Sequence, residues 1–122
     1  PLVTIVTPNL AEAEALLGVK VKDIRGMEDA AKKIHLLGAS FVLVKGGHLQ
    51  GAPIDVLFDG KSFYHFKGAR IRAVRVALHG TGCMLSAAIA VGLAKGMSVR
   101  AAVKMAKAFV EETIEKRKKR EF

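Results

Sequence analysis

The sequence has little of three features, and each scarcity excludes a class of structure. It contains one cysteine, Cys83, which excludes an internal disulfide framework and a zinc site built from several cysteines. The longest nearly unbroken apolar stretch, 85–94, is too short for a membrane-spanning helix, which needs roughly 20 apolar residues. The chain does not open on a charged segment followed by an apolar one, so we expect no secretory signal.

What is present is the composition of a globular protein. Hydrophobic residues make up 51% of the 122 residues and charged residues 25%, a mixture that is not typical of disordered chains. The sequence starts at Pro1 and runs directly into apolar residues. We therefore expect it to be an excerpt of a longer protein.

The positive charge is concentrated at one end. Of the net charge of +9, the segment 116–120 alone contributes five, and the other fifteen basic and eleven acidic residues leave +4. The single Tyr and the six Phe are not interleaved with these cations, as base-stacking platforms would be. A solvated helix end is therefore favoured over a polyanion contact, and cations also suit the carboxyl end of a helix.

Apolar periodicity predicts strands and helices that alternate along the chain. Short β-branched or apolar runs at 2–7 and 41–44 are typical of buried strands, and Asp59-Gly60 between 54–58 and 62–66 predicts a hairpin. A further strand is expected within 71–77. Apolar residues at helical spacing predict helices over 10–17, 27–37 and about 83–95, and a last helix that Ser98 caps.

This order of elements is typical of an α/β fold in which helices cover buried strands. No low-complexity linker, repeat or domain boundary is visible in the sequence. The helix at 83–95 is apolar on more faces than so short a chain can cover. We therefore expect a missing half, without which the fragment is poorly stable or self-associates.

The segment Gly80-Thr81-Gly82-Cys83 has the character of an anion site. Small residues let a phosphate approach the backbone, and the unpaired amides of a first helical turn point at it. A thiolate in the same turn is stabilised by those amides, so the segment could supply both an anion hole and a base. The alternative is a glycine-rich helix cap beside a buried, inert cysteine.

Two further segments carry candidate residues. Asn9 with Glu12 three residues later is the pattern of a capping box, and the same two side chains could hold the water shell of Mg²⁺. Lys45 follows a predicted strand and precedes two glycines, at a position where ligands bind in open α/β sheets. The alternative for Lys45 is a tight turn with a surface lysine. Asp55 either pairs with a lysine or serves a nucleotide, and Glu14 is expected to be a solvated helix residue.

The four histidines show no spacing typical of metal ligands. We expect His35 at the surface of a helix and His65 on an alternating strand, and we interpret His48 and His79 as hydrogen-bonded loop residues. The four methionines are interpreted as packing residues.

Taken in order, the segments 7–14, 44–48, 55–57 and 79–83 resemble the hydroxymethylpyrimidine/phosphomethylpyrimidine kinases of thiamine biosynthesis, which belong to the ribokinase-like superfamily. The resemblance covers essentially the whole chain but matches only the C-terminal half of such a kinase. It implies a ribokinase-like three-layer α/β/α fold, of which residues 1–122 form the C-terminal half of the central sheet with flanking helices and a β-hairpin. The cysteine of G-T-G-C also occurs in pyridoxal kinases.

The resemblance implies ATP-dependent phosphorylation of hydroxymethylpyrimidine and then of its monophosphate, in the cytoplasm, with Mg²⁺. By this resemblance Cys83 is the catalytic base, and the anion hole is formed by Gly80, Thr81 and Gly82. The ATP phosphates contact Lys45 and Asn9, and Glu12 contacts Mg²⁺ through water. The family's N-terminal half, which carries most pyrimidine contacts, has no counterpart in this sequence.

Several alternatives stay open at this point. The chain could come from a pyridoxal kinase of the same superfamily, or be a truncated or split fragment that binds nucleotide without catalysis. A basic nucleic-acid-binding module is the weaker alternative. We expect a small-molecule substrate as the partner, and we expect neither nucleic acid nor a membrane. We also expect that the chain forms a homo-oligomer or needs the missing N-terminal half.

Overall fold

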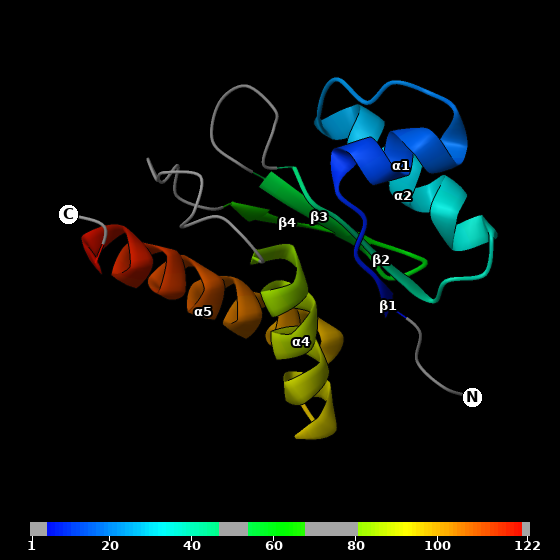
Figure 1. The fold of residues 1–122 in the computed structure, drawn as a ribbon. Coiled ribbons are helices and arrows are strands. Elements are labelled where there is room, and N and C mark those ends of the chain that lie inside the picture. The colour runs from blue at the N-terminus through cyan, green and yellow to red at the C-terminus, as the bar shows by residue number, and fades with distance from the viewer. Residues whose placement is uncertain (1–4, 47–53, 68–80, 121–122) are drawn as a thin grey trace. The chain divides into compact units, whose positions relative to one another are not determined.

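The computed structural model describes residues 5–46, 54–67 and 81–120. Its elements are β1 (Ile5–Val6), α1 (Leu10–Leu17), α2 (Ile24–Leu36), β2 (Phe41–Val44), β3 (Ile54–Phe58), β4 (Phe63–Lys67), α4 (Thr81–Ala94) and α5 (Val99–Arg120) (Figure 1). The chain divides into two compact units, 1–68 and 69–122. No change of composition marks this division in the sequence.

The first unit contains a mixed sheet with the strand order β1-β2-β3-β4. β1 and β2 are parallel, and the connection between them carries α1 and α2. β2 pairs with β3, and β3 with β4, in antiparallel fashion. The α/β class expected from the sequence is confirmed, while the strand expected within 71–77 lies outside the described residues.

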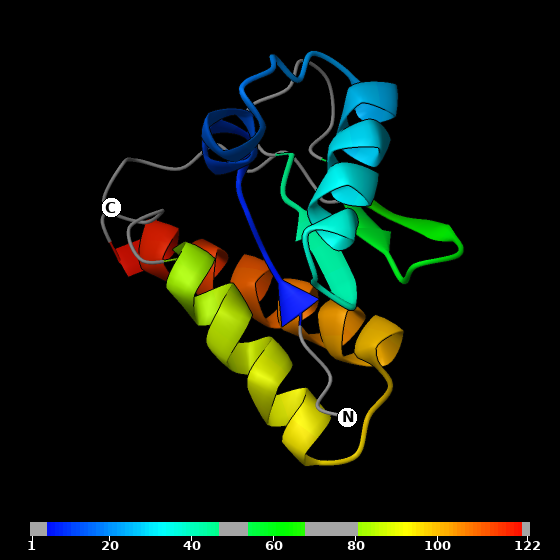
Figure 2. The ribbon, with the colours of Figure 1, turned by 90° about the vertical axis from the view of Figure 1, so that its right-hand side faces the viewer.

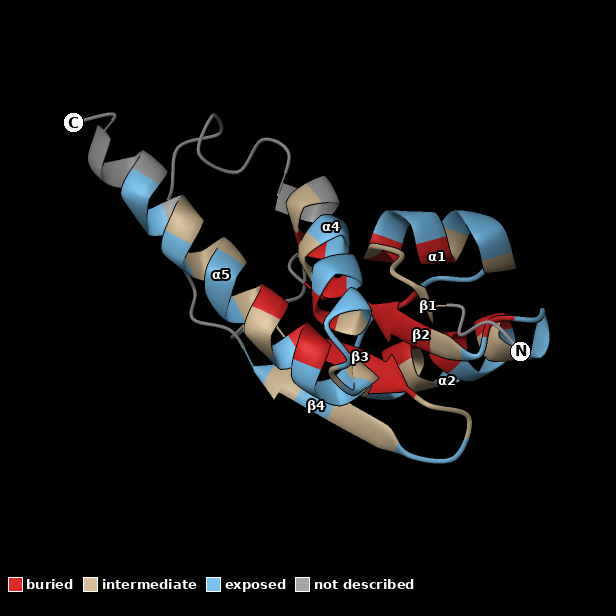
Figure 3. Ribbon diagram, turned by 90° about the horizontal axis from the view of Figure 1, so that it is seen from below, coloured by how far each residue is buried: buried red, intermediate tan, exposed pale blue. Residues whose placement is uncertain are grey.

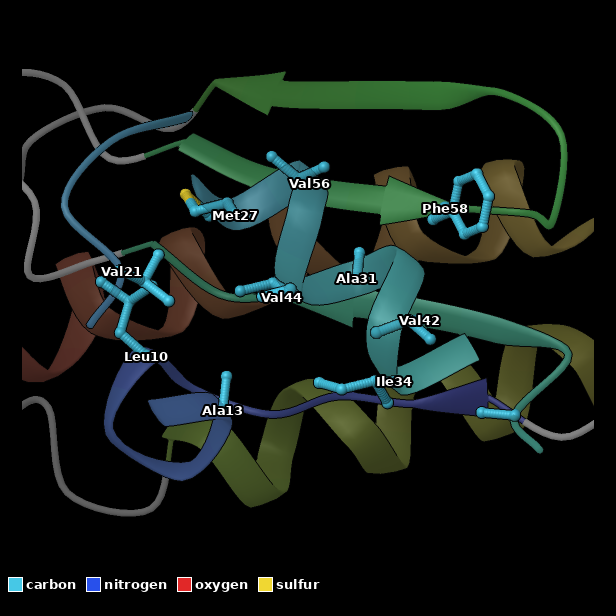
Figure 4. Close-up of a cluster of buried hydrophobic side chains, with 12 residues drawn as sticks. Leu10, Ala13, Val21, Met27, Ala31, Ile34, Val42, Val44, Val56 and Phe58 are labelled. Atoms are coloured by element: carbon cyan, nitrogen blue, oxygen red, sulfur yellow. The ribbon is translucent and has the colours of Figure 1, made fainter. Parts of the chain in front are cut away.

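α2 covers one face of this sheet. Alternate residues of β2 and β3 point toward the apolar side of the helix, because successive side chains of a strand face opposite ways (Figure 4). The cluster is completed by α1 and by the loop that follows it, and its buried members are Leu10, Ala13, Val21, Met27, Ala30, Ala31, Ile34, Ala39, Val42, Val44, Val56 and Phe58. Full burial of one large member contributes about 1.5–3 kcal/mol.

Exposure follows the same arrangement within this unit. β2 and β3 are almost wholly buried, whereas β4 and the outer side of α1 are intermediate or exposed (Figure 3). β4 has one strand neighbour, β3, in the sheet order, so it forms an edge of the sheet in the described part of the chain.

The second helix begins earlier than the sequence indicated. It was expected to start at Met27, where the apolar periodicity begins, but α2 starts at Ile24. Asp23 caps it, since its Oδ1 accepts the backbone N–H of Gly26 at 2.7 Å. The expected start was wrong because Ile24, one turn before Met27, also packs against the core, directly after the cap.

Glu14 is not a purely solvated residue of α1. Its Oε2 accepts the backbone N–H of Val21 at 2.7 Å, and the side chain is half-buried. The bond ties the loop between α1 and α2 back onto α1. The expectation was wrong because this partner lies seven residues away, beyond the reach of helical periodicity.

Asp59 organises the hairpin between β3 and β4. Its Oδ1 accepts the backbone N–H groups of Lys61 at 2.8 Å and Ser62 at 2.7 Å. The hairpin predicted from Asp59-Gly60 is confirmed. Its second strand starts at Phe63, opposite Phe58, and not at Ser62 as expected, because the bond to Asp59 keeps Ser62 in the turn.

His35 is half-buried rather than at the surface. Its Nδ1 lies 2.7 Å from the carbonyl oxygen of Ala39, and its ring meets Phe58 edge-on with 5.2 Å between centroids. A Cβ at Gly60 would lie 3.2 Å from the His35 ring. The surface expectation was wrong because a helical pattern does not show that the hairpin turn reaches the end of α2.

His65 lies on the alternating strand β4, as expected, and is exposed. Its Nε2 lies 2.9 Å from Oε2 of Glu28. The contact joins the edge strand to α2.

The second unit is a pair of helices packed side by side (Figure 2). Gly92 of α4 lies against α5, so that an added Cβ would come within 2.9 Å of the Cβ of Ala102. The turn between the helices contains Gly96 at φ +86°, in the left-handed region that favours glycine. Oγ of Ser98 accepts the backbone N–H of Ala101 at 3.2 Å, which confirms the predicted cap.

α5 continues to Arg120, so the basic segment 116–120 is helical. Within it Lys116 is exposed and pairs with Glu112 at 3.2 Å, one helical turn earlier. None of the helices described for this chain is both long enough and apolar enough to cross a membrane.

Replacing Asp59 by Ala removes the acceptor of two turn amides. We expect the free energy of unfolding to fall by about 0.5–1 kcal/mol, in the range of a lost cap or a single net hydrogen bond. Asp59→Asn keeps an acceptor oxygen and should recover most of this loss at neutral pH. Urea denaturation of the full-length protein measures both changes, and equal losses in the two variants would contradict the role of the acceptor.

The same bonds make the hairpin sensitive to acid. The backbone amide of Ser62, followed by that of Lys61, holds the pKa of Asp59 below its ordinary value of 3.8. The stabilisation is therefore present above that value and is lost as the pH falls through the lowered pKa of the folded state. Asp59→Asn should show a shallower loss of stability than the parent in this acid range.

Candidate functional site

Two of the segments singled out in the sequence meet at the ends of neighbouring strands. Because β1 and β2 are parallel, their carboxyl ends lie at the same edge of the sheet. The backbone N–H of Lys45 donates to the carbonyl oxygen of Pro8 at 2.9 Å, and Asn9 and Lys45 form one further parallel bridge. The Asn9 segment and Lys45 are thereby adjacent, at the edge where open α/β sheets bind ligands.

Asn9 and Glu12 form the capping box that the sequence predicted. Oδ1 of Asn9 accepts the backbone N–H of Glu12 at 2.8 Å, and Oε1 of Glu12 accepts the backbone N–H of Asn9 at 2.9 Å. The box starts α1 directly after β1, so the positive end of the helix dipole lies at the same edge as Lys45. Glu12 is exposed, and its two carboxylate oxygens give it capacity for further partners.

The chain leaves β2 through Gly46, which is buried. A Cβ at this position would collide with the carbonyl oxygen of Ile54 and lie 2.8 Å from Cε of Met27. The backbone N–H of Gly46 donates to Oδ1 of Asp55 at 3.0 Å. Glycine is required here for the close approach of two strand ends, so the glycine after Lys45 has a packing reason.

The bond between Gly46 and Asp55 was missed by the sequence analysis. A signal was present, because Asp55 is the one acidic residue in the apolar run 54–58. Asp55 is 6% exposed. A carboxylate buried in such a strand needs strong hydrogen-bond partners, which indicates a specific role.

The segment with the cysteine belongs to the second unit. α4 starts at Thr81, so the backbone of Thr81, Gly82 and Cys83 forms its first turn. The N–H groups of a first turn have no partner within the helix, as an anion hole requires. Gly80 lies outside the described residues, as do Gly47, His48 and His79. That Cys83 shares a site with Lys45 stays a prediction.

A family model described as phosphomethylpyrimidine kinase matches residues 1–121. The chain belongs to the phosphomethylpyrimidine kinase family. It is 44% identical over 119 residues to the hydroxymethylpyrimidine/phosphomethylpyrimidine kinase of Aquifex aeolicus, a match that covers 97% of this chain and 46% of that enzyme. The resemblance inferred from the four segments is thereby confirmed.

Solved structures of vitamin kinases share the fold. The pyridoxal kinase of Staphylococcus aureus in complex with ADP matches 88% of this chain at 41% identity and a TM-score of 0.83, over 40% of its own length. The phosphomethylpyrimidine kinase of Clostridium difficile matches 91% at 36% identity and a TM-score of 0.76, over 43% of its length. The chain therefore spans less than half of each of these three relatives.

Gly46→Ala tests the close approach at the end of β2. The added methyl collides with the backbone carbonyl of Ile54, which cannot swing aside as the end of the Met27 side chain can. We therefore expect a destabilisation of about 1–3 kcal/mol, as for overpacking in a core. Gly18→Ala is the matched control: Gly18 has φ +70° but no atom within 4 Å of an added Cβ, so its cost is backbone strain of about 1 kcal/mol. Thermal denaturation in which Gly46→Ala costs less than the control would contradict the packing argument.

Proposed function

We propose that the full-length protein transfers a phosphoryl group from ATP to hydroxymethylpyrimidine and then to its monophosphate, and that this chain supplies the ATP-phosphate side of the site. The observation that carries the proposal is the bridge between Asn9 and Lys45 at the carboxyl edge of two parallel strands. It joins two segments of the family pattern at the place where such sheets bind ligands. Membership of the family supports the reaction class.

Lys45 supplies positive charge for the ATP phosphates. Its backbone is held by Pro8, so its side chain starts from a fixed point beside the amino end of α1. Phosphoryl transfer depends mainly on positioning and on neutralisation of charge, which a lysine beside a helix amino end provides. Asn9 holds the start of α1 and contributes an amide to the same phosphates.

Cys83 acts as the base in this proposal. The hydroxyl oxygen of the pyrimidine attacks the γ-phosphorus of ATP, the bond to the bridging oxygen breaks, and ADP leaves. The Cys83 thiolate takes the hydroxyl proton. Gly80, Thr81, Gly82 and the Cys83 amide bind the transferring group through backbone N–H donors, which stabilise charge that develops in the transition state.

Glu12 and Asn9 fit a Mg²⁺ ion held through water. Glu12 is exposed and keeps Oε2 outside the capping box, and Oδ1 of Asn9 keeps a second lone pair. Hard oxygen atoms of this kind are the donor chemistry that Mg²⁺ prefers. Within the described residues there is no group of three acidic, histidine or cysteine side chains that could form a cage. When bound, Mg²⁺ supplies charge neutralisation at the phosphates.

Pyridoxal is the second candidate substrate. The solved structures of the pyridoxal kinase of Staphylococcus aureus are 40–41% identical to this chain, and one of them is a complex with AMP-PCP and pyridoxal. A non-catalytic nucleotide-binding fragment is the third candidate, because the chain spans 46% of the Aquifex aeolicus enzyme. Phosphoryl transfer by the full-length protein, with hydroxymethylpyrimidine and pyridoxal compared side by side, separates the three.

Cys83→Ala in the full-length enzyme should lower kcat by roughly 10²- to 10⁴-fold, the usual contribution of a positioned general base. ATP affinity should stay near that of the parent, because the anion-hole donors are backbone groups. Cys83→Asp should retain part of the activity, since a carboxylate can take the same proton. Steady-state kinetics and calorimetry with AMP-PCP give the two quantities.

Ala87→Ser, a small change at an exposed position in the second turn of the same helix, is the control for general damage to α4. An unchanged kcat in Cys83→Ala would remove the cysteine from the mechanism. The thiol should also react with an alkylating agent faster than a free cysteine near neutral pH, and ATP should protect it.

A further inference from the structure

Asp55 is a buried acid in a strand that packing alone would make apolar. Its neighbours in β3 are Ile54, Val56 and Leu57, and its exposed fraction is 6%. Removing a carboxylate from water costs several kcal/mol unless hydrogen bonds replace the lost hydration. A valine would suit the packing of this strand, so an acid at this position indicates a bond that an apolar side chain cannot make.

One such bond runs to the chain segment that carries Lys45. Oδ1 of Asp55 accepts the backbone N–H of Gly46 at 3.0 Å, and the bond is buried. A charged acceptor makes a hydrogen bond stronger than a neutral one. The pairing between β2 and β3 ends at Val44 and Val56, and Lys45 and Asp55 are the next residues on the two strands. The carboxylate therefore continues the strand pairing where the backbone ladder ends.

Lys45 is consequently held from both sides. Its own N–H donates to Pro8 at the end of β1, and the next N–H along the chain donates to Asp55 on β3. The absence of a side chain on Gly46 allows the close approach that this second bond needs. Together these contacts fix the peptide between Lys45 and Gly46 and hence the origin of the lysine side chain.

We infer that Asp55 is a positioning residue for ATP binding, which acts by holding the Lys45–Gly46 peptide at the edge of the sheet. The inference rests on the proposed function of Lys45. Asp55 acts through its acceptor oxygen on Gly46 and not through contact with the nucleotide. A loss of this bond lets the lysine move away from the phosphates, and a shift of about 1 Å at such a contact is costly.

The test uses the full-length enzyme with Asp55→Ala, Asp55→Asn and Lys45→Met. Asp55→Ala should raise KM for ATP and Kd for AMP-PCP roughly 10-fold or more, with KM for the pyrimidine within about threefold of the parent. Asp55→Asn keeps an acceptor for the Gly46 amide and should stay within about threefold for both ligands. If Asp55→Ala does not fold, Asp55→Val, a strand former that likewise lacks an acceptor, takes its place.

Asp59→Ala is the matched control, because Asp59 follows the other end of β3 and also accepts backbone amides. It should lower stability without changing KM for ATP. The double variant that combines Asp55→Ala with Lys45→Met distinguishes positioning of Lys45 from a merely structural role of Asp55. Once Lys45 is gone, the loss of Asp55 should weaken AMP-PCP binding no further, since residues that act as a unit are not additive.

The outcomes separate this inference from the proposed function. If the parent enzyme binds AMP-PCP and Asp55→Ala binds it equally well, the role of Asp55 is wrong while the kinase proposal stands. If Asp55→Asn is as impaired as Asp55→Ala, the charge and not the acceptor matters, and the inference is overturned. Full additivity with Lys45→Met also overturns it. A parent enzyme that binds no ATP analogue removes both proposals.

Discussion

The pairing of the carboxyl ends of β1 and β2 is the constraint on which the candidate site depends. The bond from Lys45 to Pro8 and the bridge to Asn9 bring two distant segments of sequence to one point. Parallel pairing makes this possible, because it places both strand ends at the same edge and leaves α1 and α2 to form the connection. The amino end of α1 then lies where the lysine emerges.

Backbone groups and short polar side chains define the geometry of this edge. Asn9 and Glu12 start α1 by exchanging hydrogen bonds with each other's backbone, and Asp55 holds the amide of Gly46. Such contacts are short and directional, so small displacements weaken them strongly. The core beneath, formed by α2 against β2 and β3, gives these contacts a rigid base.

The chain belongs to a known kinase family, but it spans less than half of the length of the relatives compared above. The match over residues 1–121 establishes the family, and one relative, the pyridoxal kinase of Staphylococcus aureus, was solved in complex with ADP. The chain nevertheless spans 46% of the Aquifex aeolicus enzyme. Phosphoryl transfer to the pyrimidine and to pyridoxal is therefore to be compared with the full-length protein.

Local chemistry in the sequence determined the helix caps at Asn9 and Ser98, the buried strand at 41–44 and the hairpin, because each depends on residues only a few positions apart. The four segments together also determined the family. Only the tertiary structure showed the half-buried position of His35, the bond of Glu14 to Val21 and that of Asp55 to Gly46. These depend on how a strand, a turn or a loop returns to a distant part of the chain, and apolar periodicity carries no information about that return.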